Sequence, residues 1–370
     1  MPPDFKDTLR EHRRAVITGL DLPGQDDTQQ LLEELTLLLA NLNIETAAVA
    51  VQKREKPDSA YLLGSGKVRD LKVLAQASSA DLIVCNDMLS PVQLSNIRRV
   101  TDCEVWDRSL TIMKIFERRA VTAEAKLQVE LARCKYEIPH IRGLGMQMSN
   151  AGAGIGTRGP GETEFESHRR KLQSRVVEIT RKLEEMKKRR EGQRKQRKRS
   201  GIPIIALVGY TNSGKTTLLK RLSRDQNLYA ADQLFATLDT TVRTIHAPSG
   251  QPLLMADTVG FIRRLPPELI AAFRTTLEEA CEADMLLIVL DANDPSLTST
   301  YDVIQQTLRE IGAAELPRAV VLNKIDRAGV FKVNRFKELI QNEGLPVCAI
   351  SALTGERTET LWNLFDRFLK

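Results

Sequence analysis

Aromatic residues make up only 5% of the 370-residue chain, and its five cysteines show no Cys-x-x-Cys spacing. The cysteines lie in or beside segments with strand or helix patterns, which indicates reduced core thiols of a cytosolic protein. The four histidines are scattered and form no metal set. No apolar run approaches the roughly 18 residues of a membrane span, and no signal segment opens the chain. We expect a cytoplasmic protein with room for two globular domains.

The net charge of +6 is concentrated in one segment. Residues 169–200 hold 15 Lys or Arg and 4 Glu, so the rest of the chain is net negative. Two interpretations stay open: the cations bind phosphates, or they form a solvated helical face with i,i+4 partners such as Glu184 and Glu185. We favour RNA as the partner of these cations. Folded RNA is preferred to single strands, because no aromatic side chain lies in this segment for stacking on bases. The candidate RNA-binding residues are Arg158, Arg169, Arg170, Lys187, Lys188, Arg189, Arg190, Arg194, Lys195, Arg197, Lys198 and Arg199.

Residues 209–216 read Gly-Tyr-Thr-Asn-Ser-Gly-Lys-Thr, between the apolar run 202–208 and a helical pattern. Glycines at both ends allow a tight turn whose N–H groups, with the positive end of the helix, surround a phosphate. Lys215 would reach the β and γ phosphates, and Thr216 would hold Mg²⁺. A chance glycine-rich turn rarely matches all eight positions at such a junction. The predicted nucleotide-binding residues here are Gly209, Tyr210, Thr211, Asn212, Ser213, Gly214, Lys215, Thr216 and Thr217.

Three later motifs each follow an apolar strand pattern. Asn323, Lys324 and Asp326 follow 319–322, and the Asp326 carboxylate can accept hydrogen bonds from N1–H and the exocyclic amine of guanine. Because adenine lacks both donors, such a site discriminates by about 10⁴ to 10⁵. Asp257 and Gly260 follow 252–256, where the Asp can meet Mg²⁺ through water and the Gly N–H can meet the γ phosphate. Ser351, Ala352 and Leu353 fit a loop that packs on guanine.

These four elements resemble the signature set of a Ras-like GTPase domain, predicted here over 201–370. The resemblance implies a doubly wound α/β fold, a mostly parallel sheet with helices on both faces and ligand loops at the carboxyl ends of the strands. Continuous apolar runs predict its buried strands at 202–208, 253–256, 285–290, 319–322 and 347–350. A helix is expected at 359–369.

Two positions make this GTPase unusual. Phe261 stands where many GTPases carry a Gln that orients the attacking water, so intrinsic hydrolysis should be slow without a partner or bound ion. Asn212 stands where several similarly substituted GTPases use Asn beside K⁺, although a side chain that only caps the turn is equally compatible. Switch I lies near Phe235, and Thr237 is our choice for its Mg²⁺-binding hydroxyl. Lys215, Thr237 and Gly260 form the predicted catalytic set.

The switch I pattern Phe-x-Thr-Leu resembles the Obg and HflX group, and residues 257–263 with the following Leu265 and Pro266 resemble HflX itself. Residues 107–136 and the glycine-rich segment 154–163 carry the same resemblance, which thus covers nearly the whole chain. Departures include Glu164 and Phe165 where Gln-Leu is expected, and Thr240 where Pro is usual. A carboxyl-terminal domain found in some relatives is not expected.

Strand patterns at 15–19, 46–51, 82–85 and 104–106 alternate with helical patterns at 28–42, 67–77 and 91–99, which predicts a small α/β domain at 1–106. Residues 109–135 predict one helix. The segment 107–200 would then be helical, with a glycine-rich loop at 151–163 and a basic linker helix at 169–200. Residues 64–67, Gly-Ser-Gly-Lys, lack the spacer and final Ser or Thr of a phosphate loop and are taken as a bare turn.

The family resemblance implies a GTPase that binds GTP or GDP with Mg²⁺ and is stimulated by K⁺. It also implies binding to rRNA of the large ribosomal subunit and splitting of stalled ribosomes under stress. We expect a monomer. Two other classes stay open: an RNA-remodelling NTPase, and a signalling GTPase whose first half binds a protein.

Overall fold

The computed structural model describes residues 13–24, 27–149, 160–199, 201–225, 235, 241–264 and 281–369. Its helices include residues described by main chain alone, at 142–149, 160–164, 191, 193–199, 367 and 369. The chain divides into two compact units, the first made of 1–118 and 127–182 and the second of 119–126 and 183–370.

The first unit contains a parallel four-stranded sheet in the order β2-β1-β3-β4. Its strands are β1 (Arg13–Asp21), β2 (Ile44–Lys53), β3 (Leu82–Cys85) and β4 (Glu104–Asp107). The crossover helices that parallel strands require are α1 (Thr28–Ala40), α2 (Ser65–Ala77) and α3 (Pro91–Thr101). The small α/β domain expected from the sequence is therefore present. The bounds of each predicted strand and helix agree with the observed ones to within about two residues.

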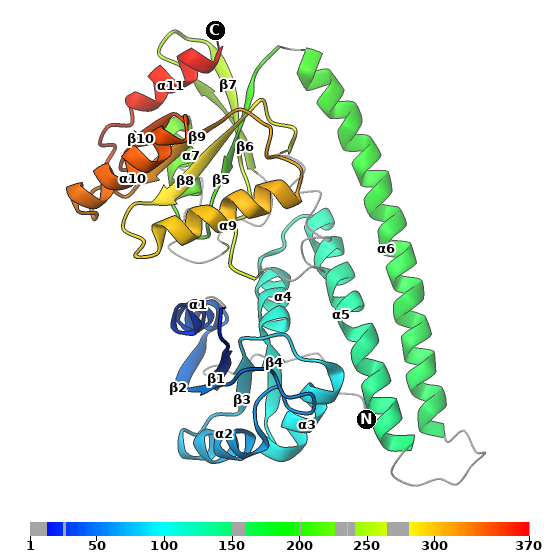
Figure 1. Cartoon of the computed structure of the whole chain (residues 1–370). Coiled ribbons are helices and arrows are strands. Elements are labelled where there is room, and N and C mark those ends of the chain that lie inside the picture. Colours follow the sequence, from blue (N-terminus) through cyan, green and yellow to red (C-terminus); the bar gives the residue numbers. More distant parts are fainter. Residues whose placement is uncertain are drawn as a thin grey trace. The chain divides into compact units, whose positions relative to one another are not determined.

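Helices cover both faces of this sheet (Figure 1). Val16 and Ile83 pack with Val68 of α2 and Ile97 of α3 in one cluster. On the opposite face a Cβ added at Gly19 would lie 3.5 Å from Leu32 Cδ2 of α1, so that helix packs closely on β1. Alternating side chains of each strand thus fill two separate layers.

The helical part of the chain comprises α4 (Arg108–Arg119), α5 (Ala123–Ser149) and α6 (Pro160–Arg199). The single helix predicted at 109–135 is wrong, because the chain breaks between α4 and α5. Thr122 explains the restart, since its Oγ1 accepts a hydrogen bond from the N–H of Ala125 at 3.1 Å, as a helix N-cap does. Helix α6 begins at Pro160, inside the predicted glycine-rich loop, because Pro suits a first helical position.

The second unit contains a six-stranded sheet in the order β10-β9-β8-β5-β7-β6. Its strands are β5 (Ile204–Val208), β6 (Thr241–His246), β7 (Pro252–Asp257), β8 (Met285–Asp291), β9 (Arg318–Asn323) and β10 (Val347–Ala349). All pairs are parallel except β6 with β7. The five predicted strands are confirmed. Strand β6 was not predicted, because its burial is mixed and gives no continuous apolar run.

Helices cover both faces of the second sheet (Figure 1). On one face Ile288 and Val320 pack with residues of α9 (Leu297–Glu310) and α10 (Val330–Asn342). On the other, Leu287 and Val321 pack with residues of α7 (Lys215–Ser223) and α11 (Thr360–Leu369). This is the doubly wound α/β fold expected from the sequence.

Among the described residues, no helix combines the length and apolarity needed to cross a membrane. All five cysteines are free thiols, and burial raises the pKa of Cys134 to about 11. Neither feature points to disulfide chemistry.

Arg108 provides a test of the first unit's interior. Its side chain is 2% exposed; Nη2 donates to Glu34 Oε1 at 2.8 Å and Nη1 to Asn86 Oδ1 at 2.9 Å. Arg108→Ala would leave Glu34 buried without its guanidinium, so the free energy of unfolding should fall by about 3 to 5 kcal/mol. Urea unfolding followed by Trp106 fluorescence in a Trp362→Phe background measures it.

Arg170 is the matched control, because its pair with Glu166 lies at the surface, with 74% of the Arg170 side chain exposed. Arg170→Ala should change stability by less than about 1 kcal/mol. Equal effects of the two substitutions would contradict the structural role given to Arg108.

Candidate nucleotide-binding site

The predicted motifs of the second unit converge on one edge of its sheet. The phosphate-loop sequence 209–214 joins β5 to α7, Asp257 ends β7, Asn323 ends β9, and Ser351 follows β10. These strands run parallel, so their carboxyl ends meet at the same edge, as in other doubly wound folds that bind ligands there. The sequence predicts this common edge because each motif directly follows an apolar strand pattern.

Lys215 is the first residue of α7 and is buried, with 6% of its surface exposed. Its Nζ donates to the carbonyl oxygens of Gly209 at 3.1 Å and Tyr210 at 2.9 Å. Burial lowers the pKa of Lys215 to about 8, and the Asp257 charge opposes that shift. An ammonium held out of water without a contacting carboxylate suits an anionic ligand such as a phosphate.

Two further loop hydroxyls, Thr211 Oγ1 and Ser213 Oγ, are buried and have no hydrogen-bond partner among the residues that the structure describes. Buried polar atoms are almost always satisfied in proteins, so these two mark a place where a polar ligand fits. Next to them, Thr216 Oγ1 donates to Asp257 Oδ2 at 2.6 Å, which brings the two predicted Mg²⁺ residues together. Hydroxyl and carboxylate oxygens are the donors that a hard divalent cation prefers.

Asn323 ties three motifs together. Its Nδ2 donates to the carbonyl oxygen of Ser213 at 2.9 Å, and its Oδ1 accepts from the N–H of Ala352 at 2.8 Å. Gly214 makes this possible: its φ is +93°, and a Cβ there would lie 2.2 Å from Asn323 Nδ2. The amide therefore fixes the phosphate loop against the loop at 351–353.

Two supporting residues escaped the sequence reasoning. Arg221 of α7 donates from Nε to the carbonyl oxygen of Ala352 at 3.1 Å and from Nη2 to that of Leu353, so it holds the predicted guanine-packing loop. The second residue is Asp291 at the end of β8, whose Oδ2 lies 2.9 Å from Nζ of Lys324, a predicted nucleotide-binding residue. The position of Asp291 after an apolar run was a usable signal, whereas nothing in the sequence marks Arg221.

The segment 257–263 lies directly against the phosphate loop. The N–H of Phe261 donates to Gly209 O at 3.0 Å, and the N–H of Thr211 donates to Phe261 O at 2.8 Å. Gly260 approaches so closely that a Cβ there would lie 2.8 Å from Thr211 Cα and 3.0 Å from Lys215 Nζ. The Phe261 ring is 3% exposed and packs in the core beside Val208 and Leu290, so it lies away from any attacking water.

The other predicted site residues differ in burial. Asn212 is exposed, with a φ of +61° that Asn tolerates in turns. Phe235 is buried, at 2% exposure. Thr237 lies outside the described residues, so its predicted contact with Mg²⁺ is untested. Thr217 lies partly buried in α7, while Asp326 follows β9 with 20% of its side chain exposed. Among the described residues no cluster of His, Cys, Asp and Glu forms a metal centre.

The candidate RNA-binding residues of α6 differ in how far their side chains are exposed. Arg190 pairs with Glu124 and keeps only 19% of its side chain exposed, whereas Arg170, Lys188 and Arg189 are exposed. Arg169 and Lys187 are half-buried. Arg158 lies outside the described residues, as do the side chains of Arg194, Lys195, Arg197, Lys198 and Arg199.

The fold and the converging loops define a P-loop GTPase domain. Family models match three consecutive parts of the chain: "GTP-binding GTPase N-terminal" at 29–117, "GTP-binding GTPase Middle Region" at 119–197 and "50S ribosome-binding GTPase" at 204–324. The GTPase HflX of Lacrimispora saccharolytica is 40% identical over 96% of this chain and 83% of its own length. That of Escherichia coli is 41% identical over 82% of this chain and 71% of its own length. The chain belongs to the HflX family of GTPases.

A solved structure is similar to this chain over nearly its whole length. A GTP-binding protein from Sulfolobus solfataricus in complex with GDP is 26% identical, with a TM-score of 0.51, and the match covers 96% of this chain and 98% of that one. A second crystal structure, titled as a complex of SsGBP and GDP, is 28% identical with a TM-score of 0.55 at the same coverage. The family models and the relatives together show that the chain is a GTPase whose GTPase domain is of the 50S ribosome-binding type.

Gly214→Ala tests the loop geometry. A methyl group there meets Asn323 Nδ2, so the tie between Asn323 and Ser213 must break, and we expect GDP affinity to fall by more than about tenfold. Titration with a fluorescent GDP analogue measures the loss. Gly250→Ala is the matched control, because its φ of +84° gives similar backbone strain with no atom within 4 Å. Equal affinities of both variants would reject the clash as the cause.

Proposed function

We propose that this chain hydrolyses GTP while bound to the large ribosomal subunit, and that the hydrolysis accompanies splitting of stalled ribosomes under stress. Membership of the HflX family supports the ribosomal partner, since one family model that matches the chain describes a 50S ribosome-binding GTPase. The observation that carries the proposal is the burial of Phe261 at the position where a water-orienting side chain is expected. A site built in this way gains from a partner that completes it.

The phosphate loop, residues 209–217, holds the triphosphate through its N–H groups, and Lys215 neutralises the β and γ oxygens. Its depressed pKa reflects burial, which a phosphate anion would offset. Asp326 accepts hydrogen bonds from the guanine edge while residues 351–353 pack on the base. The bonds of Arg221 and Asn323 to Ala352 support that placement.

Thr216, Asp257 and Thr237 are the residues we assign to Mg²⁺. When bound, the ion spreads the negative charge that develops on the phosphate oxygens. The short contact between Thr216 and Asp257 already places two of these donors together. Asn212 is assigned to K⁺ in the same way, on the family resemblance alone.

Water attacks the γ phosphorus in line with the leaving oxygen, and the Gly260 N–H and Lys215 stabilise the equatorial oxygens. Phe261 cannot orient this water. Contact with the ribosome therefore supplies the missing group or moves a main-chain group into place, which makes hydrolysis depend on the correct partner.

Residues 1–106 and 107–200 engage rRNA, and residues 201–370 switch with the nucleotide. The exposed cations of α6 support this division, because each Lys or Arg placed on an RNA phosphate strengthens salt-dependent binding. We propose that the protein acts as a monomer on ribosomes in the cytoplasm.

The direct test measures GTP hydrolysis in KCl and Mg²⁺, alone and with purified large ribosomal subunits. We expect stimulation by the subunits. A variant with Arg170, Lys188 and Arg189 changed to Gln should bind them more weakly, with a log–log salt slope smaller by up to about 3. The control changes three exposed cations of residues 201–370, Arg309, Arg335 and Arg357, to Gln and should keep the slope.

The outcomes separate the candidate functions. Intact protein that binds GTP yet shows no stimulation by subunits contradicts the ribosomal proposal. Equal stimulation by protein-free RNA favours an RNA-remodelling NTPase, and salt-insensitive binding to a protein partner favours a signalling GTPase.

Base selection gives a second prediction. Asp326→Asn replaces one carboxylate acceptor by an amide donor, which mismatches guanine but complements the C2 carbonyl of xanthine. We expect GTP hydrolysis at limiting nucleotide to fall by about 10² or more and XTP hydrolysis to appear. Asp294→Asn, at the turn before α9, is the control. Unchanged preference for GTP in Asp326→Asn would place the base elsewhere.

A further inference from the structure

The first part of the segment after β7 is hydrogen-bonded to the phosphate loop. Tyr210 and Phe261 form a parallel bridge, made of the two main-chain hydrogen bonds that join Phe261 to Gly209 and Thr211. Thr258 Oγ1 adds a hydrogen bond to Leu207 O at 2.7 Å. Residues 257–261 therefore continue the sheet edge.

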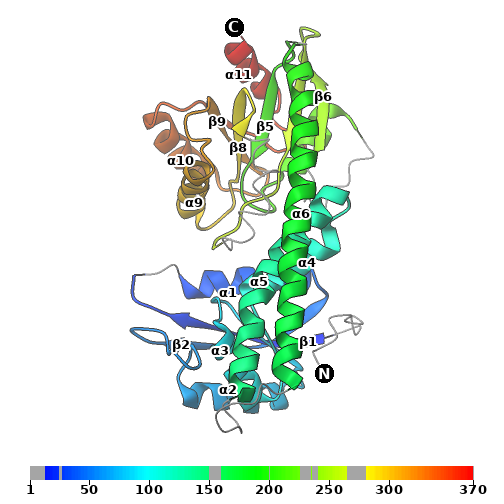
Figure 2. The ribbon, with the colours of Figure 1, turned by 90° about the vertical axis from the view of Figure 1, so that its right-hand side faces the viewer.

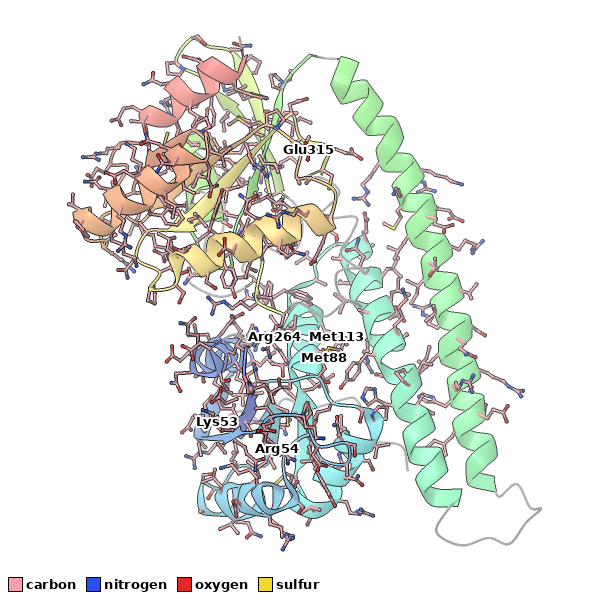
Figure 3. The ribbon with its side chains drawn as sticks, in the orientation of Figure 1. Lys53, Arg54, Met88, Met113, Arg264 and Glu315 are labelled. Carbon is pink, nitrogen blue, oxygen red and sulfur yellow. The ribbon has the colours of Figure 1, made fainter. Side chains whose placement is uncertain are left out.

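The side chain of Tyr210 extends this tie by two residues. Its hydroxyl accepts a hydrogen bond from the main-chain N–H of Arg263 at 2.7 Å, while its ring packs on the core of the second unit. The Arg263 side chain is 7% exposed, and its Nη2 lies 3.4 Å from Ser299 Oγ of α9. Arg264, labelled in Figure 3, follows with a φ of +51°, an uncommon value for Arg that marks where the tied stretch ends.

Gly260 lies between Thr258, which is bonded to Leu207 O, and Phe261, which is held by the bridge. The Tyr210 hydroxyl fixes the chain two residues beyond Phe261, at Arg263. A Cβ on Gly260 would lie 2.8 Å from Thr211 Cα, so the main chain there lies close to the phosphate loop. The orientation of the Gly260 N–H relative to the phosphate loop thus depends on both ties.

We propose that Tyr210 is a positioning residue for hydrolysis: its hydroxyl holds the 260–263 main chain so that the Gly260 N–H faces the γ phosphate. This inference rests on the proposed role of Gly260 and adds a role for a side chain that the phosphate-loop motif leaves open. Because GDP has no γ phosphate, the tie distinguishes the two nucleotide states. Removing the hydroxyl should weaken the triphosphate state and spare the diphosphate state.

Tyr210→Phe removes the hydroxyl and keeps the ring. In single-turnover hydrolysis with Mg²⁺ and KCl and without ribosomes, the rate should fall about fivefold, close to the loss of one neutral hydrogen bond. Affinity for a non-hydrolysable GTP analogue should fall by a similar factor, while GDP affinity stays within about twofold. Tyr301→Phe is the control: the Tyr301 hydroxyl, on α9, donates to Glu343 Oε2 at 2.8 Å, and neither residue belongs to the nucleotide loops.

Amide hydrogen exchange supplies a readout that general destabilisation would not reproduce. In Tyr210→Phe the peptide containing Arg263 should exchange faster, while the peptides of β8 and β9 stay as protected as in the unchanged protein. Equal loss of GDP and analogue affinity with faster exchange throughout the second unit would show a merely structural role. The inference would be overturned if Tyr210→Phe hydrolysed GTP, bound the analogue and exchanged the Arg263 amide as the unchanged protein does. Unchanged protein that binds neither nucleotide would remove the proposed function and this inference together.

Discussion

The side-chain amide of Asn323 is the interaction on which the nucleotide site depends. It joins the loop after β5 to the loop after β10 through one donated and one accepted hydrogen bond, both buried. A buried amide with one partner removed leaves the other side unsatisfied, so the two bonds act as a unit. The same contact explains why residue 214 has no side chain, and Arg221 reinforces it from α7. Three loops from separate strands thereby become one rigid surface, which is what discrimination between bases requires.

Beside this fixed surface, the loop after β7 is held firmly but carries no side chain that could orient the attacking water. Phe261 stands at the position where a Gln is expected, and it packs in the core at 3% exposure. Burial of an aromatic ring stabilises the segment and anchors Gly260 against the phosphate loop. This arrangement supports the proposal that hydrolysis is slow without a partner and is controlled by whatever contacts the site from outside.

Much of this was predictable, and the exceptions have physical causes. Strands β5, β7, β8 and β9 are largely buried on both faces, and β10 is a partly buried edge strand. All five appear as apolar runs, and the motif after each of β5, β7, β9 and β10 falls at the carboxyl-terminal edge of the sheet. Strand β6 forms an edge whose side chains are partly exposed, and its pattern is weak. The break at Thr122 depends on one hydroxyl cap inside a helical pattern. Arg221 and the Tyr210 hydroxyl make contacts with residues 131, 132 and 53 positions away, which no local pattern encodes.

The cations of the basic helix α6 include some that form ion pairs with carboxylates and others that are exposed. Arg175 donates from Nε and Nη2 to both oxygens of Glu130 on α5, and Figures 1 and 2 both show the two helices side by side there. Lys182 and Arg175 lower the pKa of Glu178 on α6 itself, so these cations already have carboxylate partners. Such exposed pairs contribute little stability, but the two-pronged geometry of Arg fixes the register of the helices. Arg170, Lys188 and Arg189 remain exposed along α6. A scaffold set by the Arg175 and Lys182 pairs can present these exposed cations at fixed spacing, which suits the proposed binding to folded RNA with its regular array of phosphates.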